Sequence, residues 1–145
     1  MWGHLPEPAR RIAVATADAV AAAGTDGAGD ALAALDPQQV KLVLGAVVRL
    51  LVEELHPDGL DADDITAIVA RCAAAYPAAD PQAQLVLLAG ALGIHPDAEE
   101  TGPVDVPRQA PLLIADLLAV ARRPLTRYLE AAFAEIARGE TMDLP

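Results

Sequence analysis

The chain has 145 residues, 54 % of them hydrophobic and only 3 % aromatic, and its 10 basic and 21 acidic residues give a formal net charge of −11. This length predicts a single domain over residues 1–145, which is large enough to fold without a disulfide or a metal. Because so negative a surface repels nucleic-acid phosphates and anionic lipid head groups, we expect neither nucleic acid nor a membrane as partner.

The first expected helix covers residues 8–23, opened by Pro6 and Pro8 and ended by the glycine-rich turn at 24–27. Arg10 and Arg11 precede an apolar stretch, which leaves a twin-arginine export signal as an alternative. Asp18 interrupts that stretch, so we favour an ordinary amphipathic helix and expect a cytoplasmic protein. A short helical piece is expected at 29–35.

The second helix, residues 38–56, has the clearest start signal in the chain. Asp36 is the expected N-cap, Pro37 occupies the first helical position, and Gln39 is expected to close a capping box. The helix is apolar nearly all round, which is typical of a helix buried on several sides. We therefore expect it at the centre of the fold.

Two further helices follow, at 61–76 and 81–93. Asp61 caps the first of them, and Asp63 and Asp64 suit the positive end of its dipole. The second carries an apolar run at 85–94 that is too short to span a bilayer, so we expect a second central helix there. The cap-and-proline start at residue 80 echoes the one at 36, but such starts are common in helical proteins, so a duplication of 36–58 in 80–97 is left open as an alternative.

The remainder of the chain is expected to be a loop followed by helix. Residues 96–107 are acidic, rich in proline and glycine and without periodicity, which predicts an exposed loop. Residues 110–138 are helical, with Pro124 as a kink or a new start, Gly139 as the end and 140–145 as a frayed tail. The fold class is thus an all-α, compact bundle of five to six helices, two of them central and apolar.

No group of residues predicts a known chemistry. The chain has no serine, which removes every serine nucleophile, and Cys72 lies on an apolar helical stripe where a thiol is inert. The aspartates of 58–64 lack the spacing of a calcium loop, and no two histidines are spaced for zinc. We expect no catalytic residues, metal site or cofactor, and we expect that the chain is not an enzyme.

The last helix carries the strongest candidate for an interaction surface. Aromatic side chains and arginine are the usual anchors of protein interfaces, although the same stripe can equally pack a core. The candidate residues are Leu125, Arg127, Tyr128, Phe133 and Ile136. We predict a non-enzymatic interaction or assembly module that binds a protein partner or itself. The alternative is a bundle that holds an apolar small molecule between its helices, where Gly90 and Gly93 leave room.

Overall fold

The computed structural model describes residues 3–94 and 104–142, with residues 140–142 as backbone only. The described residues form helices and no strand, which confirms the all-α bundle; the helices number seven, slightly more than expected. They are α1 (Glu7–Ala21), α2 (Asp30–Ala33), α3 (Pro37–Leu55), α4 (Ala62–Ala75), α5 (Pro81–Ala91), α7 (Val106–Ala121) and α8 (Leu125–Met142).

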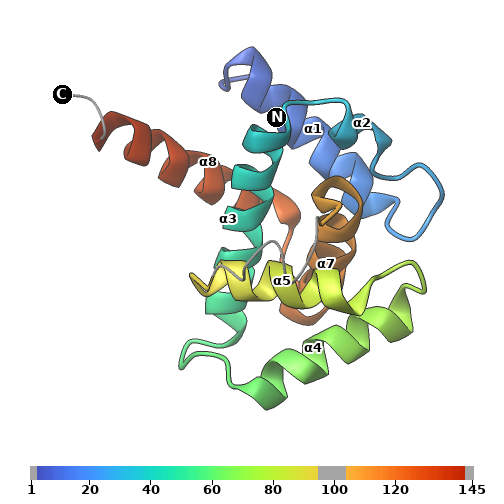
Figure 1. The fold of residues 1–145 in the computed structure, drawn as a ribbon. Coiled ribbons are helices and arrows are strands. Elements are labelled where there is room, and N and C mark those ends of the chain that lie inside the picture. Colours follow the sequence, from blue (N-terminus) through green and yellow to red (C-terminus); the bar gives the residue numbers. More distant parts are fainter. Residues whose placement is uncertain (1–2, 95–103, 143–145) are drawn as a thin grey trace.

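Helix α3 lies at the centre, with α5, α7 and α8 packed around it (Figure 1). Its buried side chains are Val40, Val43, Leu44, Val47, Val48, Leu51 and Val52. Helix α7 supplies the facing part of the core, with fully buried Leu113, Ile114 and Leu117. Helices α1 and α2 cover one side of α7, and α4 lies across the other end (Figure 1). The core is therefore almost purely aliphatic.

Helix α5 is not a second central helix, which corrects that part of the expectation. One of its faces packs on α3, α4 and α7, while Leu85 and Leu92 stay exposed on the other. Helix α7, whose Leu113 and Leu117 are completely buried, takes the inner position instead. A mostly apolar helix without charged residues fits both a central and a peripheral position, so the periodicity of its sequence alone does not decide between the two.

Three helices begin after the N-cap residues that the sequence predicts. The Asp36 carboxylate accepts the Gln38 N–H at 3.0 Å, rather than forming the capping box expected with Gln39. The capping box lies instead at α4, where Asp61 and Asp64 bond each other's backbone N–H groups at 2.8 and 3.1 Å. Helix α5 repeats the α3 arrangement, because the Asp80 carboxylate accepts from the Gln82 N–H at 3.1 Å. Residues 95–97, the end of the suggested repeat, lie outside the described residues.

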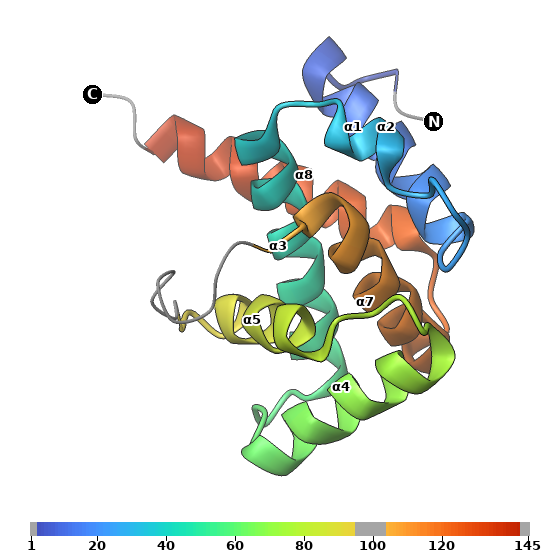
Figure 2. The same cartoon turned by 45° about the vertical axis from the view of Figure 1, so that its right-hand side comes forward.

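Two boundaries near the C-terminus differ from expectation. Helix α7 begins at Val106, inside the segment 96–107 that is expected as a loop; residues 96–103 lie outside the described part. Helix α8 begins at Leu125, directly after Pro124, so of the two expected alternatives the new start is the one observed; its end is the second boundary that differs. It then runs past the expected stop at Gly139 to Met142, and its C-terminal half projects beyond the body of the bundle (Figures 1 and 2).

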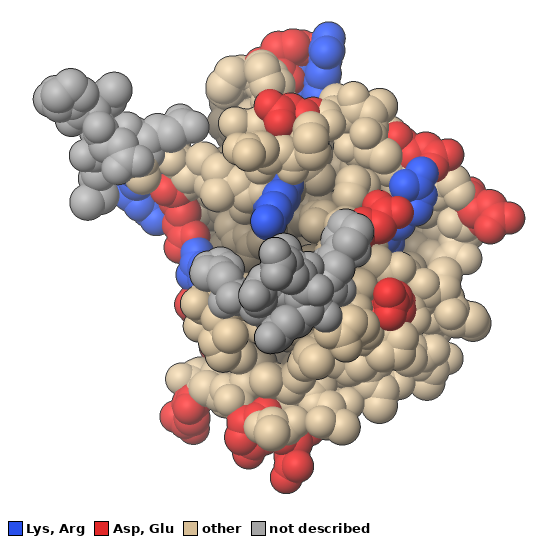
Figure 3. All heavy atoms as spheres, viewed as in Figure 1, with Lys and Arg blue, Asp and Glu red and all other residues tan. Residues whose placement is uncertain are grey.

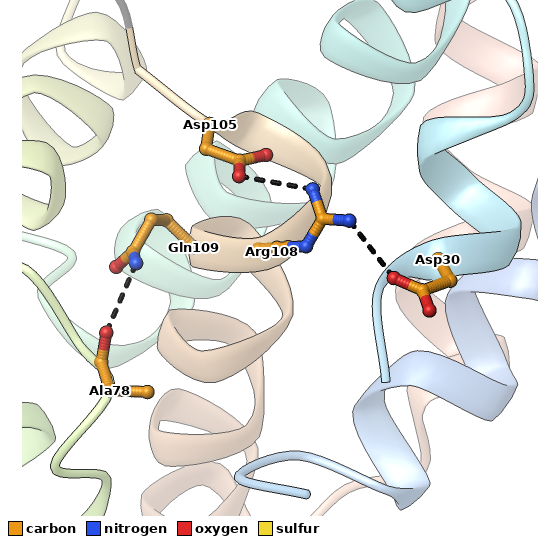
Figure 4. A network of polar contacts seen from close by, with 5 residues as sticks. All are labelled: Asp30, Ala78, Asp105, Arg108 and Gln109. Carbon is orange, nitrogen blue, oxygen red and sulfur yellow. Dashed lines mark hydrogen bonds and ion pairs between the residues drawn. The ribbon is translucent and has the colours of Figure 1, made fainter. Parts of the chain in front are cut away.

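The first turn of α7 ties together segments that are distant in sequence (Figure 4). The Arg108 guanidinium contacts Asp105 at 3.1 Å and Asp30 of α2 at 2.9 Å. The neighbouring Gln109 donates from Nε2 to the Ala78 carbonyl at 3.2 Å, in the connection between α4 and α5. This turn therefore positions both α2 and the start of α5.

Candidate interaction surfaces

The α8 residues predicted as an interface lie along the contact between α8 and the rest of the bundle. Tyr128 is only 3 % exposed and belongs to the core. Leu125, Phe133 and Ile136 are half-buried and pack against the same core, whereas Arg127 is exposed. The structure brings the four apolar members together on one face of α8. That face is largely occupied by α3 and α1 of the same chain.

The charged side chains beside this α8 face have partners within the chain. Arg127 and Arg123 lie 3.5 and 3.9 Å from the Glu54 carboxylate of α3. Arg49 of α3 forms an ion pair with Glu135 of α8, and both side chains are about one-third exposed. Partly exposed pairs of this kind each contribute about 1 kcal/mol or less. They favour the docking of α8 on α3, but they leave few uncompensated charges for a partner.

The Tyr128 hydroxyl is a buried polar group without a hydrogen bond of standard geometry. Burial is the main reason that the pKa of Tyr128 is raised to about 12, and the negative Glu54 carboxylate nearby adds to it. A phenol in this setting stays protonated at neutral pH. Its ring fills the α3–α8 contact, which gives Tyr128 a packing role rather than an acid–base role.

The outer face of α5 is an exposed apolar surface formed by Leu85, Ala89, Leu92 and the following Ile94, with the exposed Gln82 at its N-terminal end. Leu85, Leu92 and Ile94 are 42 %, 38 % and 59 % exposed, and they account for half of the large exposed hydrophobic side chains. No charged residue occurs from Pro81 to Ile94. Acidic side chains gather at the lower edge of the molecule in the view of Figure 3.

A buried amide network fixes how α5 presents this face. Gln84 is fully buried and donates from Nε2 to the Gln109 carbonyl at 3.1 Å and to the Gln109 side-chain oxygen at 3.0 Å. The same Gln109 oxygen accepts the Asp80 N–H at 2.9 Å. Because a buried amide must be satisfied, this network allows only one rotation of α5 about its axis. Leu85 and Leu92 therefore point outward as a consequence of Gln84 pointing inward.

Sequence reasoning missed Gln84 and Gln109, although one signal for Gln84 was present. It is the last polar residue before the apolar run of α5, and a helix with a single inward polar group needs a partner for it. Nothing in the sequence indicates that this partner is Gln109, because the two residues lie 25 positions apart. Pairings of this kind depend on tertiary structure.

Cys72 of α4 lies on the inner side of α5, next to Gln84. It is fully buried, and its thiol contacts the Gln84 side-chain oxygen at 3.7 Å. Burial, with a further contribution from the nearby Asp116 carboxylate, raises the pKa of Cys72 to about 11. Asp116 is itself buried and pairs with Arg71 at 2.8 Å. The thiol is therefore protonated and shielded, which is the setting of a structural cysteine.

A separate, concave feature is the α1–α2 hollow, which has a volume of about 340 Å³. It is open to solvent, and Arg10 and Arg11 stand at one end, where both are paired with Glu7. The residues that line it are Arg10, Arg11, Val14, Ala15, Asp18, Ala31 and Leu35. An aliphatic floor with a cationic end suits an apolar molecule that carries an anionic group.

Neither a metal-binding cluster nor a membrane-spanning helix occurs among the described residues. No group of three or more histidine, cysteine, aspartate or glutamate side chains among them is arranged to hold a metal ion. No helix in the described ranges is both long enough and apolar enough to cross a membrane.

Comparison of the chain with protein-family models, with curated proteins and with solved structures yields no match. We therefore infer a function from the surfaces described above.

Proposed function

We propose that the chain is a non-enzymatic interaction module whose docking surface is the outer face of α5. One observation carries this proposal: α5 contains no charged residue and is mostly apolar, yet Leu85 and Leu92 on one of its faces are exposed. A helix with so few polar residues is normally covered on most sides. Covering Leu85, Leu92 and Ile94 contributes on the order of 1 kcal/mol for each half-exposed side chain.

The α8 residues predicted from the sequence provide a rival surface for the same function. Phe133 and Ile136 are half-buried on α8 and pack against the core of the bundle. We rank this surface second because its apolar residues already contact the core of their own chain, whereas Leu92 and Ile94 have a face free of charge and open to solvent.

Site-specific photo-crosslinking in cells tests the proposal whatever the identity of the partner. A photoreactive phenylalanine analogue is placed at Leu92, at Phe133 and, as a control, at Val120. Val120 is an apolar side chain of α7 with similar exposure, 47 %, outside both surfaces. We expect a discrete adduct from position 92 that is absent from position 120. An adduct from position 133 alone would move the function to α8, and the absence of any specific adduct would contradict an interaction role.

The α1–α2 hollow supports a second candidate function, the binding of a small apolar molecule. Its volume falls in the range of small-molecule sites, roughly 300–1,000 Å³. Arg10 and Arg11 share one carboxylate, Glu7, so one positive charge at their end of the hollow is left without a partner there, and Asp18 of the same lining carries the opposite charge. We therefore propose a ligand with a short aliphatic chain and a carboxylate.

Titration with decanoate, followed by NMR or calorimetry, tests this second function. The Ala31→Trp variant fills the hollow from an exposed position of α2, so it is expected to abolish binding and leave the fold intact. The Ala67→Trp variant, at an exposed position of α4 remote from the hollow, is the matched control. Binding that survives Ala31→Trp would place the ligand elsewhere.

A further inference from the structure

The α1–α2 hollow carries opposite charges at its two ends. Arg10 and Arg11 stand at one end of the α1 side, and Asp18 stands at the other. Resting on the ligand-binding role proposed above, we propose that the ligand of this hollow is an aliphatic zwitterion. Its carboxylate binds Arg11, its ammonium group binds Asp18, and the methylene chain between them covers the aliphatic floor.

The lining residues of α1 set the distance between the two charges. They follow the i, i+3, i+4, i+7 spacing of a single helix face and are Arg11, Val14, Ala15 and Asp18. Seven helical positions separate the first from the last, which is about 10 Å along the axis. The Arg11 side chain leans away from Asp18, because it reaches back to Glu7. An extended eight-carbon chain with a charge at each end spans about this length.

Arg11 has hydrogen-bond donors free for a carboxylate. Its Nε atom contacts one oxygen of Glu7 at 3.1 Å, while Arg10 binds the other oxygen of Glu7. Among the described residues, nothing accepts a hydrogen bond from the two terminal nitrogens of Arg11, whose side chain is exposed. Terminal guanidinium nitrogens bind a carboxylate through two parallel hydrogen bonds. The cationic end can therefore take up a second carboxylate without releasing Glu7.

Asp18 requires a positive charge at the far end of the ligand. Its carboxylate is exposed and has no ion-pair partner in the described part of the chain. An apolar tail that reached Asp18 would displace water from this carboxylate, which is unfavourable, whereas an ammonium group would form an ion pair with it. The net charge of −11 acts in the same direction, because it repels a free anion but not a ligand of zero net charge.

The floor between the charged ends suits a methylene chain. It consists of Val14 and Ala15 of α1 together with Ala31 and Leu35. Val14 is 46 % exposed, so a chain lying over it removes apolar surface from water. The hollow is open and the ligand is small, so we expect a dissociation constant on the order of 1 mM.

Two isomeric ligands test the charge separation. 8-Aminooctanoate and 2-aminooctanoate contain the same atoms and have the same net charge, but only the first carries its charges at opposite ends of the chain. NMR titration that follows the methyl signals of Val14 and Ala31 measures both dissociation constants. We expect 8-aminooctanoate to bind about two- to five-fold more tightly, as an exposed ion pair allows. Equal affinities, or tighter binding of the other isomer, would overturn the proposal.

A variant of Asp18 tests which side chain binds the ammonium group. In 8-hydroxyoctanoate a neutral polar group replaces that ammonium group, so the wild type should prefer the amine. Asp18→Asn should abolish this preference. Asp63→Asn, at an exposed position of α4 remote from the hollow, removes the same charge and should retain the preference. Loss of the preference in both variants would assign it to the overall charge of the chain and reject the role of Asp18.

The outcomes also separate this inference from the ligand-binding role on which it rests. If decanoate binds in the hollow but the two isomers bind equally well, the hollow remains a ligand site and the zwitterion is rejected. If neither decanoate nor either isomer shifts the Val14 and Ala31 signals, both proposals are rejected.

Discussion

Gly29 packs directly against the backbone of Pro107: a Cβ atom on Gly29 would come within 2.5 Å of the Pro107 carbonyl oxygen. That carbonyl is the one that residue 111 would bond in a regular helix, but Pro111 has no N–H to donate. The missing hydrogen bond leaves the oxygen free to face α2. The close approach of Gly29 and the proline inside α7 are therefore parts of one contact.

Substitution of Gly29 is expected to be costly because the obstacle is backbone and cannot rotate away. We predict that Gly29→Ala lowers the free energy of unfolding by about 1–3 kcal/mol, measured by urea denaturation. Gly45→Ala is the matched control, since a Cβ there meets nothing within 4 Å and the residue lies inside α3. The control should stabilise the protein by about 0.5–1 kcal/mol. Equal effects of the two substitutions would refute the contact.

The helix caps and the central place of α3 could be predicted from sequence because the signals are local. Asp61 marks the start of its helix within one turn, and the apolar pattern of 38–56 is too long to be anything but buried. The start of α7 was missed, since Pro107 and Pro111 are typical loop residues although proline is tolerated in a first turn. The exposure of α5 could not be predicted, because a mostly apolar helix without charged residues suits a core and an interface equally.

The candidate surfaces, too, could be predicted from the sequence only in part. The apolar stripe on α8 is visible in the sequence, but whether Tyr128 meets its own chain or another depends on how α8 docks on α3. The Gln84–Gln109 pair, which sets the rotation of α5, joins two segments across the α4–α5–α7 contact and has no local signal. Long-range pairing, rather than the periodicity of any helix, decides which apolar residues remain exposed.

The Gln84 amide should be the most sensitive polar group of the fold. Gln84→Leu removes both bonds to Gln109 and leaves a buried carbonyl without this donor. We expect a loss of about 1–3 kcal/mol in the free energy of unfolding. Gln82→Leu, on the exposed side of the same helix, should change it by less than about 0.5 kcal/mol. A neutral Gln84→Leu would show that the network does not fix α5.

Thr16 offers the opposite case, a buried hydroxyl with no partner. Replacing it by a methyl group removes an unsatisfied polar atom, so Thr16→Val is expected to raise the free energy of unfolding by about 1 kcal/mol. In Thr66→Val, by contrast, the lost hydroxyl is exposed and bonds the Ala62 carbonyl at 2.9 Å. Thermal melts should therefore shift upward for the first variant and stay nearly unchanged for the second. A lower melting temperature for Thr16→Val would show that its hydroxyl is satisfied in solution.

Stability should fall at alkaline pH because of Cys72. Its pKa is raised from 9.0 to about 11 by burial and by Asp116, so the folded state holds its proton while the unfolded state releases it. Below pH 9 the thiol is protonated in both states and the free energy of unfolding keeps its full value. As the pH rises from 9 to 11, only the unfolded state releases the proton, so the free energy of unfolding falls by an amount on the order of 2–3 kcal/mol. Urea denaturation of the wild type and of Cys72→Ala between pH 8 and 11 measures it. The slope contributed by Cys72 should be missing from the variant, whereas identical slopes in both proteins would assign it to other groups.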